Sequence, residues 1–230
     1  MSTEILSVRD LYFAQGERVI LQKLSFTMER GEVVSLLGPS GSGKSTLFRL
    51  LLGLEQWQKG TITSPLLPLR ESSCYLMQRT PLLSWRTIEE NLTLFLSKES
   101  IEEKLPELLE RFHCPPKMLV QYPHQLSVGM RQKICLIGAL LEDKPLLLLD
   151  EPFSSLDLFL REEMYRWIEE HCQKEEKSVF LITHDFYEAT SISDRILLLG
   201  EGRILQEWHN HSNPRALIGN ISESLRKLYS

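Results

Sequence analysis

The sequence predicts an α/β fold, with a mostly parallel sheet flanked by helices. Two observations lead to this prediction. Short apolar runs of strand length, at 32–37, 146–150 and 178–182, alternate with segments of helical apolar spacing, which is typical of a parallel sheet. In addition, the glycine-rich segment GPSGSGKST (38–46) lies between the first of these runs and the helical segment at 47–54. Strand, glycine-rich loop and helix in this order form the context of a phosphate-binding loop.

The remaining elements follow from local patterns. Residues 5–28 alternate apolar and polar around a predicted turn at Gly16-Glu17, which indicates an N-terminal antiparallel β subdomain. The further predicted strands are 61–63, 74–77, 195–199 and 203–206. The further predicted helices are 87–96, 101–112, 127–141, 158–172, 185–191 and one from Pro214. Thr87 with Glu90 forms a capping-box pattern, and Ser127 is a suitable N-cap.

The domain organisation follows from length and element order. We expect a single nucleotide-binding domain over residues 1–230, with an approximate helical subdomain at 80–141 and a C-terminal tail or helix at 207–230. The helix-rich stretch interrupts the alternation of strands and helices and therefore forms the subdomain.

Composition excludes several classes of protein. The net charge of −5 disfavours nucleic acid as the main partner. No apolar run approaches the ~18 residues of a membrane helix, and the N-terminus lacks a signal-peptide pattern. The four cysteines, which are Cys74, Cys114, Cys135 and Cys172, are scattered and predict free thiols in a reducing compartment. His209 and His211 could bracket a metal, but a polar tail favours two solvated side chains.

The phosphate-binding loop has the form G-x-x-x-x-G-K-[ST], from Gly38 to Ser45. Its backbone N–H groups would line a nest for phosphate oxygens, at the N-terminus of a helix. Lys44 supplies a charge for the β- and γ-phosphates, and the Ser45 hydroxyl is a ligand for Mg²⁺. The residues expected to bind the nucleotide here are Gly38, Pro39, Ser40, Gly41, Ser42, Gly43, Lys44, Ser45 and Thr46. We therefore expect ATP and Mg²⁺ as cofactors.

Further candidate residues stand at the ends of predicted strands. Asp150 ends an apolar run, as the Mg²⁺-holding acid of phosphate-loop NTPases does, and Glu151 could act as general base toward water. His184 follows the run VFLI and could contact a γ-phosphate or the attacking water. Gln78 follows CYLM and could reach the metal or the water. Hydrolysis of a bound nucleotide is the expected chemistry.

Read together, the motifs resemble the nucleotide-binding subunits of ABC transporters over residues 5–206. Beside the phosphate loop they are YLMQ with Gln78, the signature segment LSVGM (126–130), LLLLDEP, SSLD with Asp157 and ITH with His184. The resemblance implies a head-to-tail homodimer in which Ser127 and Gly129 touch the γ-phosphate bound by the partner subunit. It also implies permease subunits in the membrane, an indirect link to a solute-binding protein, and a place on the cytoplasmic face of the cell membrane.

The sequence departs from the family pattern in places. Val128 replaces a glycine of the signature segment, and its cost depends on whether that position has a positive φ or helical dihedrals. Gln15 occupies the position of the aromatic residue that stacks on adenine, and alternation sends either Tyr12 or Phe13 into the core. Gly138 stands where arginine is usual.

The segments YPHQLSVGM and LLSWRTIEENL (82–92) resemble importers of the nitrate, sulfonate and taurine type. Trp85 is there either a contact in the groove for the permease or an ordinary core residue. We therefore expect an ATP-hydrolysing subunit that energises import of a small anionic solute. The alternatives are a slowly hydrolysing regulatory or interaction ATPase and the ATPase of an ABC exporter. A chromosome ATPase of this superfamily would need a coiled coil, and no sustained heptads exist.

Overall fold

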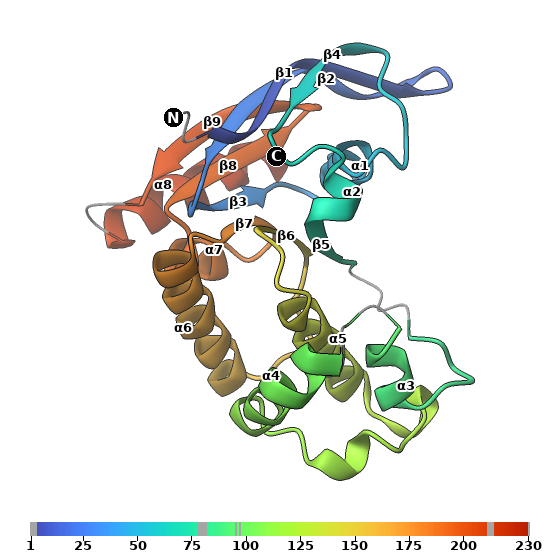
Figure 1. Cartoon of the computed structure of the whole chain (residues 1–230). Coiled ribbons are helices and arrows are strands. Elements are labelled where there is room, and N and C mark those ends of the chain that lie inside the picture. Colours follow the sequence, from blue (N-terminus) through green and yellow to red (C-terminus); the bar gives the residue numbers. More distant parts are fainter. Residues whose placement is uncertain (1–3, 78–81, 95, 97, 211–213, 230) are drawn as a thin grey trace.

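The structure is a computed structural model, which describes the chain except residues 1–3, 78–81, 95, 97, 211–213 and 230. Figure 1 shows three layers: an antiparallel sheet, a mostly parallel sheet with helices beside it, and a helical layer that contains α3, α4 and α5. The predicted α/β class with its N-terminal antiparallel part is confirmed.

The larger sheet has six strands in the order β5-β6-β7-β3-β8-β9. Five of them run parallel, and β9 pairs antiparallel with β8. The strands are β3 (Val33–Leu37), β5 (Ser73–Leu76), β6 (Leu146–Asp150), β7 (Ser178–Ile182), β8 (Arg195–Gly200) and β9 (Arg203–His209). Because β3, β6 and β7 are neighbours, the segments that follow them meet at one edge of the sheet.

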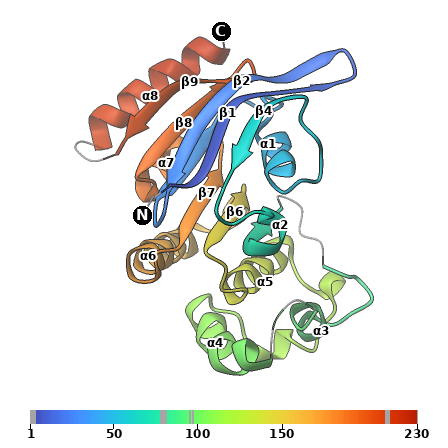
Figure 2. The same ribbon diagram turned by 45° about the horizontal axis from the view of Figure 1, so that its top comes forward.

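The smaller sheet has the order β2-β1-β4 and is entirely antiparallel. Its strands are β1 (Glu4–Gln15), β2 (Arg18–Glu29) and β4 (Lys59–Thr63). The predicted hairpin around Gly16-Glu17 is present. The predicted strand at 61–63 lies within β4, which is the third strand of this sheet. The tip of the hairpin extends over α1 in Figures 1 and 2.

The helices of four residues or more are α1 (Lys44–Leu51), α2 (Leu69–Ser72), α3 (Ile88–Leu92), α4 (Lys98–Arg111), α5 (Val128–Leu141), α6 (Leu158–Glu175), α7 (Phe186–Ile192) and α8 (Pro214–Tyr229). Short 3-10 helices cover Pro116–Met118 and Pro123–Gln125. The capping box of Thr87 and Glu90 and the Ser127 cap are both formed. Pro106 lies inside α4, as predicted.

Several helix boundaries differ from the prediction. α1 begins at Lys44 rather than Leu47, because the phosphate-binding loop runs directly into the first helical turn. It ends at Leu51, and Gly53 then turns the chain with a φ of +68°. α3 ends at Leu92, so the helix predicted to continue to residue 96 is shorter. The one-turn helix α2 was not predicted, since four residues carry no periodicity.

The core lies on both faces of the larger sheet. In β6, Leu147 and Leu149 pack toward α5 and α6, whereas Leu146 and Leu148 pack toward α1 and the antiparallel sheet. Alternate residues of a strand face opposite sides, so a strand buried on both faces is apolar throughout. This explains why LLLLD reads as a continuous run. A third, smaller cluster lies under α8 and includes Leu217 and Ile221.

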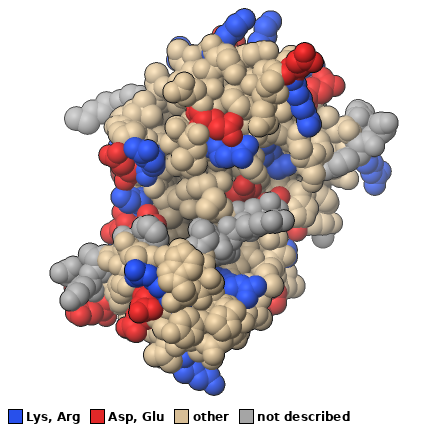
Figure 3. All heavy atoms as spheres, turned by 90° about the vertical axis from the view of Figure 1, so that its right-hand side faces the viewer, with Lys and Arg blue, Asp and Glu red and all other residues tan. Residues whose placement is uncertain are grey.

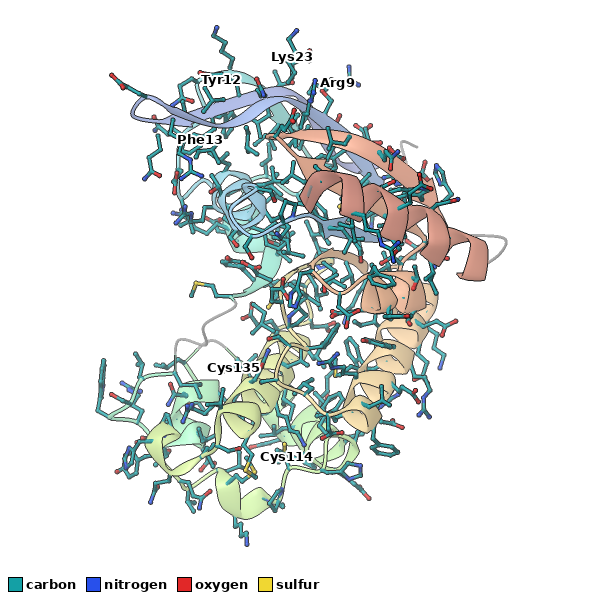
Figure 4. All side chains as sticks on the ribbon, turned by 180° about the vertical axis from the view of Figure 1, so that it is seen from behind. Arg9, Tyr12, Phe13, Lys23, Cys114 and Cys135 are labelled. Carbon is teal, nitrogen blue, oxygen red and sulfur yellow. The ribbon has the colours of Figure 1, made fainter. Side chains whose placement is uncertain are left out.

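The surface carries interspersed charges. On the face shown in Figure 3, Lys and Arg alternate with Asp and Glu, and neither sign forms a continuous patch. Within the described residues, none of the helices combines the length and apolarity that crossing a bilayer requires. The four cysteines are free thiols, as expected; Cys114 and Cys135 lie in the helical layer (Figure 4).

Candidate functional site

The phosphate-binding loop joins the end of β3 to the start of α1 and requires glycine for two different reasons. At Gly38 a Cβ would lie 2.4 Å from the Leu199 carbonyl oxygen, so no side chain fits. Gly43 is the N-cap of α1 with a φ of +104°, which L side chains rarely adopt. The loop therefore brings its backbone to the N-terminus of a helix, where N–H groups are free to bind an anion.

Lys44 lies folded back over this loop. Its Nζ donates to the carbonyl oxygens of Gly38 at 2.8 Å and Pro39 at 2.9 Å. Burial lowers the pKa of Lys44, and the nearby carboxylates of Glu151 and Asp150 oppose that shift. The ammonium is thus held at the loop by neutral acceptors, which an incoming phosphate can replace with a charge-assisted bond.

Asp150 ends β6 beside the phosphate-binding loop and accepts a hydrogen bond from the Ser45 side chain. Burial raises the pKa of Asp150, while this hydrogen bond and the charge of Lys44 oppose the shift. A serine hydroxyl and a carboxylate are oxygen donors of the kind that Mg²⁺ prefers, so the donor set fits. Ser45 and Asp150 would hold Mg²⁺, which would neutralise phosphate charge.

Glu151 and His184 meet at the same edge of the sheet. The Glu151 Oε2 lies 2.7 Å from His184 Nδ1, and the Glu151 N–H donates to the Ile182 carbonyl at 2.9 Å. Glu151 has a φ of +52°, in the left-handed region that is costly for a residue other than glycine. The hydrogen bond to Ile182 on β7 helps hold this backbone conformation, in which the carboxylate points toward His184.

Two of the predicted site residues lie away from this edge. Ser127 is the N-cap of α5, and Gly129 lies in the first turn of that helix. Both are in the helical layer, whereas the phosphate-binding loop lies at α1 (Figures 1 and 2). Within the described part of the chain, neither residue hydrogen-bonds to the loop; the Ser127 hydroxyl accepts from the Met130 N–H at 3.2 Å. Gln78 and His211 lie outside the described residues.

Val128 is the first residue of α5, and its side chain is exposed. The alternative with helical dihedrals therefore holds, and the strain expected at a positive φ is absent. Gly138 lies farther along α5, where a Cβ would come within 3.1 Å of Leu92 Cδ2. The glycine at that position lets α3 approach α5 closely.

Sequence reasoning missed Gln132, a buried residue of α5. Its Nε2 donates to the carbonyl oxygens of Glu151 at 3.2 Å and Pro152 at 2.7 Å, and its Oε1 accepts from the Ser155 hydroxyl. Gln132 thus ties the helix of the signature segment to the loop that carries the general-base candidate. Gln132 shares a helix face with Cys135 and Leu136, three and four residues on, which was the available signal.

It also missed Glu188, which supports the turn that carries His184. The Thr183 hydroxyl accepts from the Asp185 N–H and donates to Glu188 Oε2, both at 3.0 Å. Burial raises the pKa of Glu188 to about 8. The pattern T-H-D-x-x-E places this carboxyl one helical turn after the histidine.

Gln15, which is exposed, occupies the position where the family pattern has an aromatic residue for the base. Phe13 is buried in the core, and the Lys59 Nζ lies 5.6 Å from the centre of the Tyr12 ring. Figure 4 shows Tyr12 and Phe13 on opposite faces of the antiparallel sheet, as the predicted alternation requires. A cavity of about 230 Å³ nearby is lined by residues of β2 and of the loop, among them Arg18, Ile20, Lys44 and Thr46.

The family profile described as "ABC transporter" matches residues 21–154. The chain belongs to the ABC transporter family. It is an ATP-binding cassette of that family and an ATPase, as the phosphate-binding loop and the acidic edge of the sheet would require. Its relatives include "Aliphatic sulfonates import ATP-binding protein SsuB 2" of Rhizobium johnstonii, which is 38% identical and aligns over 93% of this chain and 87% of the relative.

Other relatives carry different substrate names. "Formylaminopyrimidine import ATP-binding protein ThiZ" of Halalkalibacterium halodurans is 37% identical over 86% of this cassette and 80% of its own length. Among solved structures, one described as "Structure of ATP binding subunit of ABC transporter" has a TM-score of 0.84 and 27% identity, and covers 95% of this cassette and 99% of that chain. The cassette MJ0796, solved as a dimer bound to ADP and Pi, has a TM-score of 0.80 at 24% identity over 91% of this chain and 100% of its own, and shows the shared fold.

Proposed function

We propose that this cassette hydrolyses ATP to drive import of a small anionic solute, such as a sulfonate, taurine or nitrate, through separate permease subunits at the cytoplasmic face of the membrane. The observation that carries the hydrolysis is the common sheet edge of Lys44, Asp150, Glu151 and His184. It combines a phosphate-binding cation, a metal-binding carboxylate and a general base.

The chemistry follows from where each group lies. A triphosphate on the phosphate-binding loop would draw Lys44 from its two carbonyl partners. Glu151 then accepts a proton from the attacking water, and His184 orients that carboxylate through Nδ1 while its exposed ring remains open to the γ-phosphate. Gln78 is proposed, from its place in the motif order, to link the metal to transport.

The direction and the substrate class rest on the relatives. They are import proteins named for aliphatic sulfonates, formylaminopyrimidine and sulfate or thiosulfate. Two of these three substrate classes are sulfur oxyanions, which favours an anionic solute over a cation. The exporter alternative gains no support from these relatives. Backbone strain at Val128 does not support the alternative of slow hydrolysis, because Val128 has helical dihedrals.

A second copy of the chain would complete the site. Ser127 and Gly129 stand at the N-terminus of α5, where N–H groups are free for a phosphate, but they lie away from the loop of their own subunit. A head-to-tail homodimer would bring them to the partner's γ-phosphate. The dimeric form of MJ0796 is consistent with such an arrangement.

The permease would dock beside α3. A cavity of about 260 Å³ opens between β5, α3 and α5, and its lining includes Leu82, Leu92 and Gly138. Trp85 is 71% exposed, so its interpretation as a core residue is wrong, and it is available for a contact. Trp85 follows the lining residue Leu82 by three positions, and exposed aromatic residues are enriched at protein interfaces. A solute-binding protein would act through the permease.

The test measures ATP binding and hydrolysis by the purified chain with Mg²⁺. Lys44→Ala should abolish ATP binding, because the loop then lacks its only lysine, whereas exposed Lys23→Gln is the matched control. Retained affinity in Lys44→Ala would mean that the loop is not the site. Disruption of the gene, followed by uptake of labelled taurine, methanesulfonate, nitrate or sulfate, would then identify the solute.

A further inference from the structure

Arg18 stands at the entrance of the candidate nucleotide site without a partner in the described part of the chain. It opens β2 directly after the Gly16-Glu17 turn and pairs with Gln15 in the register of the hairpin. It lines two cavities that flank the phosphate-binding loop, of about 230 Å³ and 270 Å³. Among the described residues its guanidinium makes neither a hydrogen bond nor an ion pair. The Arg18 guanidinium lines these cavities without an acidic partner, so it is available to bind a ligand.

The strand places Arg18 there through close packing. A Cβ on Gly43 would lie 2.9 Å from Leu21 Cδ2 and 3.1 Å from Ile20 Cγ2, so β2 lies directly against the N-cap of α1. The Gln22 N–H also donates to the Gly202 carbonyl at 2.8 Å. Arg18 and Ile20 line the same cavity, and Arg18 lies two residues nearer the hairpin tip.

A nucleotide on the loop would extend toward this face. The smaller cavity is continuous from Lys44, Ser45 and Thr46 to Ile20 and Arg18. With the β- and γ-phosphates at Lys44, the nucleoside end would leave the loop past the half-buried Ile20 and reach Arg18. The aromatic rings of the hairpin do not face that end, since Phe13 is in the core, Tyr12 lies on the opposite face of the sheet (Figure 4), and Gln15 stands at the expected position.

A guanidinium can replace an aromatic ring in this position. It is planar, always charged and weakly hydrated, and it stacks on the face of an aromatic system. Stacking of Arg on nucleobases contributes in the same way to single-strand nucleic-acid binding. We propose that Arg18 holds the base of the nucleotide by stacking its guanidinium on the ring, and so performs the task of the missing aromatic residue. This inference rests on the proposed binding of ATP at the loop.

The experiment separates the base from the phosphates. Calorimetry would measure the affinity of the full chain, with Mg²⁺, for ATP and for inorganic tripolyphosphate, which has no base. Arg18→Ala should weaken ATP binding by about three- to tenfold, in keeping with an interaction of a cation with a ring, and leave tripolyphosphate within about twofold. Arg18→Lys should lose most of the same affinity, because an ammonium keeps the charge but has no plane.

Arg9→Ala is the matched control, because Arg9 is an exposed arginine of the same sheet and lines neither cavity (Figure 4). Adding Gln15→Tyr to Arg18→Ala should restore ATP affinity, since a ring then returns to the hairpin. Equal losses for ATP and tripolyphosphate would overturn the proposal in favour of a phosphate contact. An unchanged ATP affinity, or an Arg18→Lys variant equal to the wild type, would overturn it as well. If the wild type bound neither ligand, the proposed function itself would fail.

Discussion

His184 Nδ1 lies 2.7 Å from Glu151 Oε2, and the two residues follow the neighbouring strands β6 and β7. The Glu151 side chain is 10% exposed and that of His184 66% exposed. The carboxylate therefore points into the site, while the imidazole has one edge on Glu151 and the rest of its ring open. This contact would hold the proposed general base in place and leave His184 able to contact a substrate.

Glu151→Gln should lower ATP hydrolysis by about 10²- to 10⁴-fold, because the amide cannot accept the proton of water. ATP affinity should stay close to that of the wild type, since Lys44 and Ser45 are unchanged. With hydrolysis blocked, the variant should form a dimer at millimolar Mg-ATP, measured by size-exclusion chromatography with light scattering. Glu162→Gln, an exposed glutamate on α6, is the control. Turnover within tenfold of the wild type, or a monomer, would contradict the assignment.

The pair should also behave as a unit in a double-mutant cycle. His184→Ala removes the group that orients Glu151, and its effect on hydrolysis should largely disappear in the Glu151→Gln background. Steady-state turnover of the two single variants and the double variant measures this coupling. Additive losses would show that His184 acts on the nucleotide independently of Glu151.

Glu188 should make stability depend on pH. Burial raises its pKa from an ordinary value of 4.5 to about 8, so the carboxyl stabilises the fold when protonated. This contribution is present below the unfolded pKa and is lost as pH rises through about 8. The charged groups around it are Glu151 and Asp185, which favour protonation, and Arg161, which opposes it.

Glu188→Gln should therefore flatten the pH profile of the unfolding free energy. The glutamine oxygen still accepts from the Thr183 hydroxyl, and no charge forms at high pH. Urea unfolding at pH 6 and pH 8 should show the variant gaining about 1–3 kcal/mol relative to the wild type at the higher pH. Glu162→Gln should show no such difference. Equal pH dependence in both variants would exclude a buried, protonated Glu188.

Val128→Gly should leave turnover within about twofold of the wild type, because valine already has helical backbone at the start of α5. Glycine in a helix costs up to about 1 kcal/mol, so the variant should be slightly less stable. ATPase assays and thermal unfolding test both statements. A large increase in turnover would show that the valine side chain hinders the partner's nucleotide.

Sequence patterns predicted the strands that carry the site, and the reason is physical. A strand buried on both faces must be apolar throughout, which made β6 and β7 visible, and the acidic or histidine residues had to follow where each run ends. The loop of 38–46 was equally clear, because it needs glycine where a Cβ would clash or where φ is positive. Helix boundaries such as Leu92 were less clear, since the apolar pattern continues beyond the last helical residue.

By itself, the sequence determined the α/β class, the phosphate-binding loop and the order of the motifs, because these depend on local periodicity and on residues close together in the chain. Only the tertiary structure decided that Trp85 is exposed, that Val128 is helical, and that Gln132, Glu188 and Arg18 lie beside the site. These properties depend on contacts between elements far apart in sequence. No local pattern contains those contacts, since they form only when the sheet orders its strands.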